Sequence, residues 1–346
     1  MEKEINSSSA NAISNGWTFQ YAAAMIIFLE NMNKAQSFCV EGTDDIVVFL
    51  KDGKISAQAK CGLEQDSIVA NHFTEIMESI RTLSSTENKD SLELISISNF
   101  HSPLGLDDSF AFTQPLDKKN FSNLTTISQN KIKSKCNELG YVIDFNKFKL
   151  WFFRFEGANP EIGVETFLDK KLESISIGSK FSTNDLMNQW LQIIQLNARD
   201  KKKIIETDIM CGTLFGKILA KTSMETIVRL IDEDVDPCYE EQFESFFAKY
   251  FSKNSQTFRI YNEIVSEFTN YVNNYKPSTR DKYKQFVDYY CRIKQIPEEI
   301  CSLFNDMSHD EMSSLSRSLF RLFVAYVCFR KNIIDSIRKA FGYENN

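Results

Sequence analysis

The chain has 346 residues, with 40 Lys and Arg against 47 Asp and Glu, and a formal net charge of −7. This acidic balance excludes a protein that binds nucleic acid through a basic surface spread over a whole domain. Hydrophobic residues make up 42% of the chain and aromatic residues 13%, so we expect a packed globular protein rather than a disordered one.

Apolar runs and cysteines indicate the cellular compartment of the protein. The longest apolar run, Ala22 to Leu29, is far shorter than the roughly 20 residues of a membrane-spanning helix. Residues 1–15 are polar and lack the basic and apolar regions of a signal peptide. The eight cysteines form no Cys-x-x-Cys and no Cys/His cluster, which is typical of a reducing compartment. We therefore expect a cytoplasmic protein without a membrane partner.

The first two hundred residues mix helical and strand-like patterns. Apolar residues at helical spacing predict helices over 16–30, 66–83 and 123–139. Alternating or β-branched runs predict strands over 45–50, 55–60, 92–98 and 148–155. This alternation predicts an α/β domain with a mixed sheet flanked by helices.

From about residue 180 the pattern becomes helical throughout. The Ser-x-x-Asp/Glu arrangement of a helix start occurs at Ser182, Ser278 and Ser308. Apolar stripes between these starts are typical of a helix-bundle core. We therefore expect two domains, an α/β domain over residues 1–205 and an all-α domain over residues 206–346.

The most informative segment is the hairpin predicted over residues 45–60. With Asp-Gly as the two central residues of a tight turn, Asp45 would face Lys60 and Val47 would face Gln58. Side chains alternate along a strand and opposed residues share a face, so Asp45 is expected beside Gln58 and Lys60. A bulge in either strand would change this register. The sequence thus predicts a carboxylate, an amide and an ammonium at one end of the hairpin.

These residue types suit metal-assisted hydrolysis of a phosphodiester. A carboxylate oxygen of Asp45, the side-chain carbonyl of Gln58 and the backbone carbonyl of Ala59 are hard oxygen ligands for Mg²⁺. Such an ion polarises a phosphoryl oxygen and lowers the pKa of an attacking water. Lys60 is expected to position or deprotonate that water and to offset charge on the phosphate. Glu41, four residues before Asp45, is expected to supply a second carboxylate.

The Asp…Gln-x-Lys arrangement resembles the PD-(D/E)xK restriction-endonuclease-like family, in the variant with Gln at the acidic position of the third motif. The similarity extends to three segments: Gly16-x-x-Phe19-Gln20-x-x-x-Ala24, Glu41-x-x-Asp44-Asp45-Ile46 and Gln58-Ala59-Lys60. Residues 10–200 resemble the double-stranded DNA endonuclease domain that begins bacterial anti-phage effectors. Those effectors include certain CBASS effectors and the nuclease subunit of Lamassu systems.

The resemblance implies roles for individual residues. Asp45 matches the metal-binding acid, and Gln58 and Lys60 match the third motif. Glu41 and Gln20 match the flanking active-site positions.

The acidic doublet and Ala59 are the two places where these motifs are ambiguous or differ from the family pattern. The Asp44-Asp45 doublet leaves the choice of metal ligand open, and we prefer Asp45 because it abuts the apolar strand and faces Lys60. Ala59 stands where the family commonly has Val, which changes the side chain but not the backbone carbonyl.

The expected fold of the second domain distinguishes between the possible relatives. CBASS effectors of this family carry a larger α/β ligand sensor, whereas residues 206–346 are expected to be helical. No phosphate-binding Gly-x-x-x-x-Gly-Lys-Ser/Thr loop occurs either. The best match is therefore the Lamassu nuclease subunit. It implies a Mg²⁺- or Mn²⁺-dependent endonuclease for double-stranded DNA, restrained by an SMC-like ATPase and a small accessory subunit, and active as a homo-oligomer.

Other interpretations of the sequence stay open. The chain could be a non-catalytic scaffold or binding subunit on the nuclease fold, or an RNase on that fold. The basic run over 199–203 is either a solvated helix end or a contact to a phosphate backbone. His72, His101 and His309 lack metal-ligand spacing and are expected to be incidental.

Overall fold

We analysed a computed structural model of the chain. It describes residues 5–41, 44–62, 71–85, 88–104, 111–154, 160–175, 182–199, 204–220, 222–253, 258–279, 281–301 and 308–343. Two compact units share these residues: residues 1–174 with 183–207, and residues 175–182 with 208–346. The main division follows Thr207, close to the domain boundary expected from the sequence.

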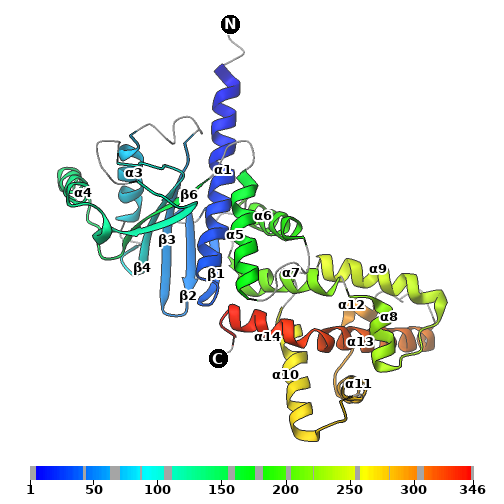
Figure 1. The fold of residues 1–346 in the computed structure, drawn as a ribbon. Helices are drawn as coiled ribbons and strands as arrows, with labels where there is room; N and C mark the ends of the chain where they lie inside the picture. The colour runs from blue at the N-terminus through cyan, green and yellow to red at the C-terminus, as the bar shows by residue number, and fades with distance from the viewer. Residues whose placement is uncertain are drawn as a thin grey trace. The chain divides into compact units, whose positions relative to one another are not determined.

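The first unit is built on a mixed sheet, with seven strands among the described residues, in the order β5-β6-β4-β3-β2-β1-β7 (Figure 1). The strands are β1 (Ala35–Val40), β2 (Ile46–Leu50), β3 (Gly53–Lys60), β4 (Ser91–Ser98), β5 (Leu116–Asn120), β6 (Phe148–Phe153) and β7 (Ile205–Glu206). Strands β1, β2 and β3 are antiparallel neighbours, whereas β3, β4 and β6 run parallel. Both edge strands, β5 and β7, pair antiparallel with their neighbours.

Helices cover both faces of this sheet, as Figure 1 shows. They are α1 (Ile5–Glu30), α3 (Phe73–Leu83), α4 (Thr126–Leu139), α5 (Pro160–Ser174) and α6 (Thr183–Arg199). Helix α1 packs against β1, β2 and β3 and also against α5 and α6, so its residues 22–29 are all buried. Helix α3 packs against β3 and β4, and α4 packs against α3. The expected mixed sheet flanked by helices is confirmed.

Several element boundaries differ from the expected ones. Helix α1 begins at Ile5 rather than at Gly16. Helix α3 begins at Phe73, and residues 66–70 of the helix expected there lie outside the described residues. A short 3₁₀ turn precedes α4, which therefore starts at Thr126. None of these changes moves the hairpin that carries the candidate site.

The register of the β2–β3 hairpin differs from the expected one. Leu50 pairs with Gly53 and Val47 with Ser56, so the expected pairing of Val47 with Gln58 is wrong. Lys51 and Asp52 are therefore the two central residues of the turn. Every pairing is shifted by two positions relative to the prediction.

The physical reason for this shift lies at Gly53. Neither Lys51 nor Asp52 has a positive φ, which the mirror-image turn favoured by Asp-Gly requires. Gly53 instead takes the fourth turn position, where glycine is common, with φ 155°. A Cβ there would lie 2.9 Å from Cγ of Leu92 on β4. A larger residue there would meet the Leu92 side chain as well as an unfavourable φ, so glycine fits this turn position without strain.

A shift of two positions leaves each side chain on its expected face. Continuing the observed register places Gln58, not Lys60, opposite Asp45. Asp45, Gln58 and Lys60 still share one face of the hairpin. The expected convergence therefore survives the error in register.

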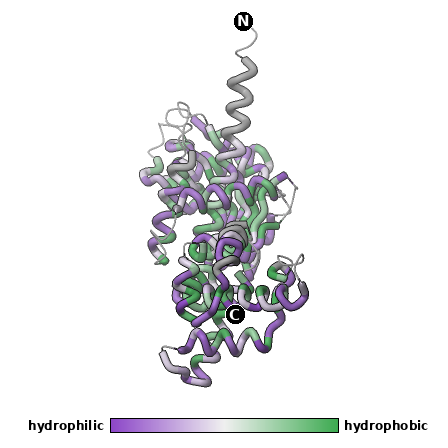
Figure 2. The backbone as a smooth tube through the Cα atoms, turned by 90° about the vertical axis from the view of Figure 1, so that its right-hand side faces the viewer, coloured by the Kyte–Doolittle hydropathy of each residue, from purple (hydrophilic) through white to green (hydrophobic). Residues whose placement is uncertain are grey.

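The second unit is helical wherever the structure describes regular elements. Its helices are α7 (Thr207–Leu219), α8 (Met224–Ile231), α9 (Pro237–Lys253), α10 (Phe258–Tyr275), α11 (Lys282–Ile293), α12 (Glu298–Cys301), α13 (His309–Phe329) and α14 (Lys331–Ala340). Residues 322–328 of α13 are buried on all sides, because α8, α10, α11 and α12 pack around this helix. Figure 2 shows hydrophobic and hydrophilic residues interspersed along the chain, as expected of helices with one buried face.

Candidate functional site

The five side chains expected at the site come from three parts of the first unit. Gln20 lies on α1, Glu41 follows β1 directly, and Asp45 precedes β2 by one residue. Gln58 and Lys60 lie at the carboxyl end of β3. Hydrogen bonds connect four of these residues directly, and Lys60 is the one outside this network.

Asp45 is held to β3 by main-chain and side-chain contacts. Its Oδ2 accepts the backbone N–H of Ala59 at 2.8 Å. With its amide nitrogen turned toward Asp45, Gln58 donates to the same oxygen at 3.2 Å and accepts the Asp45 N–H at 3.1 Å. This orientation satisfies both ends of an amide that is only 4% exposed. The other carboxylate oxygen, Oδ1, receives no hydrogen bond from the part of the chain described.

The surroundings of Asp45 disfavour its charge. Burial is the largest cause and raises the pKa of Asp45 from its usual 3.8 to about 6. The Ala59 N–H and the Lys60 ammonium lower this pKa. The neighbouring carboxylates of Glu41 and Asp44 raise it further. A cation bound at Oδ1 would relieve this cost, because it favours the ionised carboxylate.

Gln20 connects α1 to the loop between β1 and β2. Its Nε2 donates to Oε1 of Glu41 at 2.5 Å and to the main-chain carbonyl of Asp45 at 3.1 Å. The backbone N–H of Glu41 donates to the same carbonyl at 3.0 Å. Gln20, a buried amide in an otherwise apolar stretch of helix, therefore has its partners in this loop. It fixes the Glu41 carboxylate beside Asp45.

Glu41 also has an unusual backbone. Its φ is 61°, in the left-handed region that residues other than glycine seldom adopt. Such conformations cost roughly 1–3 kcal/mol and persist where the surrounding contacts hold them. Here the contacts from Gln20 and from the Asp45 carbonyl hold the turn that presents the Glu41 side chain.

Asp44 lies in a different environment from Asp45. It is 3% exposed, and its Oδ1 accepts from Nδ2 of Asn88 at 3.1 Å. Asn88 accepts in turn from the Ser56 hydroxyl at 2.8 Å. The second oxygen of Asp44 is buried and receives no hydrogen bond from the residues that the structure describes, and burial raises the pKa of Asp44. Asp44 is thus enclosed in a polar layer between the sheet and α3, and Asp45 is the more accessible acid of the doublet.

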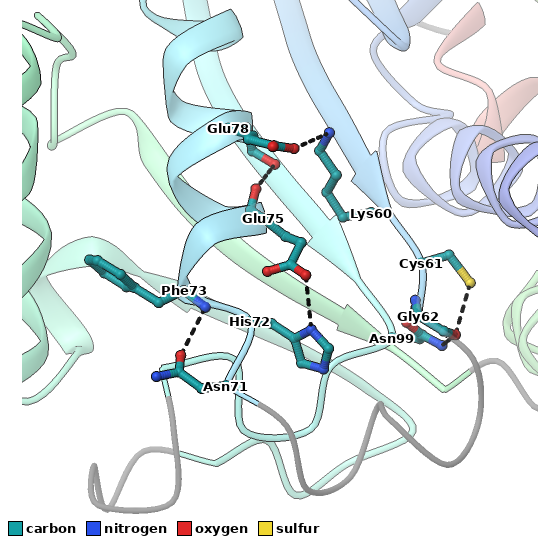
Figure 3. A network of polar contacts seen from close by, with 10 residues as sticks. Lys60, Cys61, Gly62, Asn71, His72, Phe73, Glu75, Glu78 and Asn99 are labelled. Atoms are coloured by element: carbon teal, nitrogen blue, oxygen red, sulfur yellow. Dashed lines mark hydrogen bonds and ion pairs between the residues drawn. The ribbon is translucent and has the colours of Figure 1, made fainter. Parts of the chain in front are cut away.

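Lys60 ends β3 with its ammonium near two acids. Its Nζ lies 3.5 Å from Oε2 of Glu78 on α3, with the two side chains 28% and 50% exposed (Figure 3). A solvated pair of this length contributes little stability. Lys60 is also close enough to Asp45 to lower its pKa. The ammonium therefore lies within electrostatic reach of both Glu78 and Asp45.

The chain is fixed again just after Lys60. Asn99 accepts the backbone N–H of Gly62 at 2.9 Å and donates to its carbonyl at 3.0 Å, as Figure 3 shows. His72 stacks on Phe100 with ring centroids 3.7 Å apart and is 5% exposed. These contacts make the end of β3 a rigid support for Lys60.

Sequence reasoning missed Glu78, the Lys60 partner. The available signal was its spacing of three residues from Glu75, which places both acids on one face of α3. It also missed Asn88, which lies between α3 and β4 and became visible only through its contact with Asp44.

The donors at the site fit a hard cation. Oδ1 of Asp45 and Oε2 of Glu41 are carboxylate oxygens without a hydrogen bond from the described residues, and such oxygens are ligands for Mg²⁺ or Mn²⁺. No group of three or more His, Cys, Asp and Glu forms a metal-binding cluster within the described ranges. The set is therefore two carboxylates, the Ala59 carbonyl and, once its amide turns, Gln58. An ion that keeps several waters suits such a set.

Comparisons of the chain with protein-family models, with curated protein sequences and with solved structures found no match. None of the helices in the described ranges combines the length and the apolar character needed to cross a membrane.

Proposed function

We propose that this protein is a metal-dependent endonuclease that cleaves double-stranded DNA on a restriction-endonuclease-like domain. The observation that carries the proposal is the link from Asp45 to Gln58 and Ala59, one residue before Lys60. The resemblance noted in the sequence implies this same set of groups at one end of a hairpin. The order of α1, three antiparallel strands, α3 and a parallel strand is compatible with that fold.

The residues divide the chemistry between them. The carboxylates of Asp45 and Glu41 would hold the cation, assisted by the carbonyls of Gln58 and Ala59. When bound, the ion acts as a Lewis acid on a phosphoryl oxygen and acidifies a water. Lys60 donates to the phosphate or orients the attacking water, which stabilises the charge that develops on the phosphorus oxygens.

We also propose the biological setting that the resemblance implies. The chain acts as an effector of a bacterial anti-phage defence system, in the cytoplasm, within a Lamassu-type complex containing an SMC-like ATPase and a small accessory subunit. The helical unit is the part of the chain available for restraint and assembly. One site cuts one strand, so a double-strand break is made most simply by two sites in a homo-oligomer.

Nucleic-acid cleavage by the purified protein tests the proposed activity. Supercoiled plasmid, linear duplex DNA and an RNA of equal length are incubated separately with Mg²⁺ or Mn²⁺, each with and without EDTA. We expect the two DNA substrates to be cut, RNA to remain intact, and EDTA to stop the reaction. Cleavage of RNA alone would replace this proposal with an RNase on the same fold.

A non-catalytic scaffold is the second candidate function. It is favoured by the engagement of both ends of the Gln58 amide with Asp45, which makes a self-contained motif without a metal. Calorimetric titration with Mn²⁺ separates the two. The nuclease predicts binding that is lost in Asp45→Asn, whereas the scaffold predicts no binding at millimolar Mn²⁺ in either protein.

A further inference from the structure

An exposed indole lies on the helix that carries Gln20. Trp17 is 43% exposed, whereas the other two tryptophans, Trp151 and Trp190, are 4% and 0% exposed. A single exposed apolar side chain is ordinary. Trp17, however, pairs with Tyr21 one helical turn later, at 6.3 Å between ring centroids and 36° between ring planes.

This aromatic pair lies on the helix that contacts the carboxylate site through Gln20, and a cation lies on a helix packed against it. Helix α6 packs against α1, and the exposed side chain of Arg199 lies in the last turn of α6. Burial and the charge of Glu41 raise the pKa of Tyr21, and the charge of Arg199 lowers it. Tyr21 therefore lies within electrostatic reach of both Glu41 and Arg199, and Gln20, its neighbour on α1, contacts Glu41 directly.

An indole, a phenol and a guanidinium in this order match the components of a nucleic-acid strand. An indole presents a flat face on which a nucleobase stacks. Arginine binds a phosphate with two parallel N–H groups, and a tyrosine hydroxyl donates to phosphate as well. The net charge of −7 gives the rest of the molecule no general attraction for DNA, so local contacts must hold the strand.

We infer that Trp17, Tyr21 and Arg199 form a strand-holding surface beside Glu41 and Asp45, where an unpaired base stacks on Trp17 and the adjoining phosphate binds Arg199. This inference rests on the proposed nuclease function and specifies its substrate. A base inside an intact duplex must leave the stack before it can meet an indole, which costs a few kcal/mol. The preferred substrate is therefore DNA with unpaired nucleotides near the cleavage point, such as overhangs, gaps or frayed ends.

Tryptophan fluorescence tests the surface without any cleavage. The full-length protein is titrated in EDTA with a duplex that has single-stranded overhangs and with a blunt duplex whose ends are closed by hairpins. Since Trp17 is the exposed tryptophan, base stacking quenches its emission. We expect quenching and tighter binding with the overhang duplex. Equal quenching and equal affinity with the closed duplex would overturn the inference.

Substitutions assign the binding to these residues. Trp17→Ala should weaken binding of the overhang duplex about 10-fold, and Trp17→Phe should recover part of the loss. Arg199→Ala should weaken binding and reduce the dependence of log Kd on log salt by about one ion. Tyr275→Ala removes an aromatic ring that is 64% exposed in the second unit and serves as the matched control with unchanged binding. Wild-type affinity in Trp17→Ala would contradict the inference.

The proposed nuclease function and the proposed strand-holding surface can be refuted independently of each other. Quenching that depends on Trp17 without metal-dependent cleavage would support a strand-binding surface and refute the nuclease. Metal-dependent cleavage with unchanged kinetics and binding in Trp17→Ala and Arg199→Ala would support the nuclease and refute the surface.

Discussion

At the scale of single residues, the buried carboxyl of Asp45 links stability to function. Its pKa is about 6 in the folded protein and about 3.8 in an unfolded chain. Between these values the folded state binds more protons, so the free energy of unfolding falls as pH rises from about 4 to about 6. Above pH 6 the loss is complete and amounts to about 3 kcal/mol. The site is thus maintained at the expense of stability, as functional sites often are.

Asp45→Asn should remove this cost. The asparagine carbonyl can still accept the Ala59 N–H, so the fold is preserved. In EDTA at pH 8 we expect the variant to be more stable than the wild type by up to about 3 kcal/mol, with a smaller gain at pH 4.5. Urea denaturation at the two pH values measures this. Asp52→Asn, in the exposed turn, is the control without a pH-dependent gain, and a variant less stable at pH 8 would contradict the assignment.

The proposed nuclease activity should depend on the same ionisation. Because protons compete with the cation for Asp45, the cleavage rate at low metal concentration should fall as pH drops through about 6. A tenfold rise in metal concentration should move the midpoint of this fall to lower pH. Initial rates from pH 5 to pH 8 at two Mn²⁺ concentrations provide the test. A midpoint that does not respond to metal would exclude Asp45 as a ligand.

At the scale of secondary-structure elements, the hairpin shows what local sequence rules can predict. Alternation along the strands predicted correctly that Asp45, Gln58 and Lys60 share a face. The Asp-Gly pair predicted the wrong register, and local rules do not include the contact that Gly53 makes with Leu92 on β4, a strand almost forty residues later. Strand β5 was missed for a different reason. Its sequence, Leu-Asp-Lys-Lys-Asn, is polar, as is common in an exposed edge strand, and therefore lacks the apolar alternation that predicts a strand.

The close approach at Gly53 leads to a double-mutant prediction. Gly53→Ala should destabilise the protein more than Gly140→Ala. Gly140 also has a positive φ, 71°, but no atom of the described residues lies within 4 Å of a Cβ added there. We expect about 1 kcal/mol for Gly140→Ala from backbone strain alone and about 2–3 kcal/mol for Gly53→Ala. Denaturant titration measures both.

Leu92→Ala supplies the second half of this cycle. Leu92 is 43% exposed, so its truncation costs little by itself. If the contact with Leu92 sets the glycine position, the added cost of Gly53→Ala should shrink in the Leu92→Ala background. Strict additivity of the two changes would show that the register has another cause.

At the scale of the whole molecule, the acidic charge constrains how the proposed nuclease would engage DNA. A net charge of −7 disfavours idle binding to bulk DNA, so the proposed binding would be confined to a cation and a few local groups. The sequence predicted the mixed sheet and the helical region, because hydrophobic periodicity encodes both. It could not predict the contacts of Gln20 and Asn88, since their partners come from loops and strands distant in the chain.

For the whole molecule, we predict that the active form is a homo-oligomer. If two sites must act together, the rate of double-strand breakage should rise more steeply than in proportion to protein concentration, while nicking rises in proportion. Sedimentation under the same conditions should show an oligomer at the concentrations that linearise plasmid. A sedimenting monomer that linearises plasmid with a first-order dependence on protein would contradict assembly.

The most direct test of the central claim is metal-dependent cleavage of supercoiled plasmid by three matched proteins. These are the wild type, Lys60→Ala and Lys51→Ala, the last being a lysine in the exposed turn of the same hairpin. We predict that wild type and Lys51→Ala cut the plasmid with Mg²⁺ and not with EDTA, while Lys60→Ala is at least 100-fold slower. Cleavage by Lys60→Ala at the wild-type rate would contradict the account.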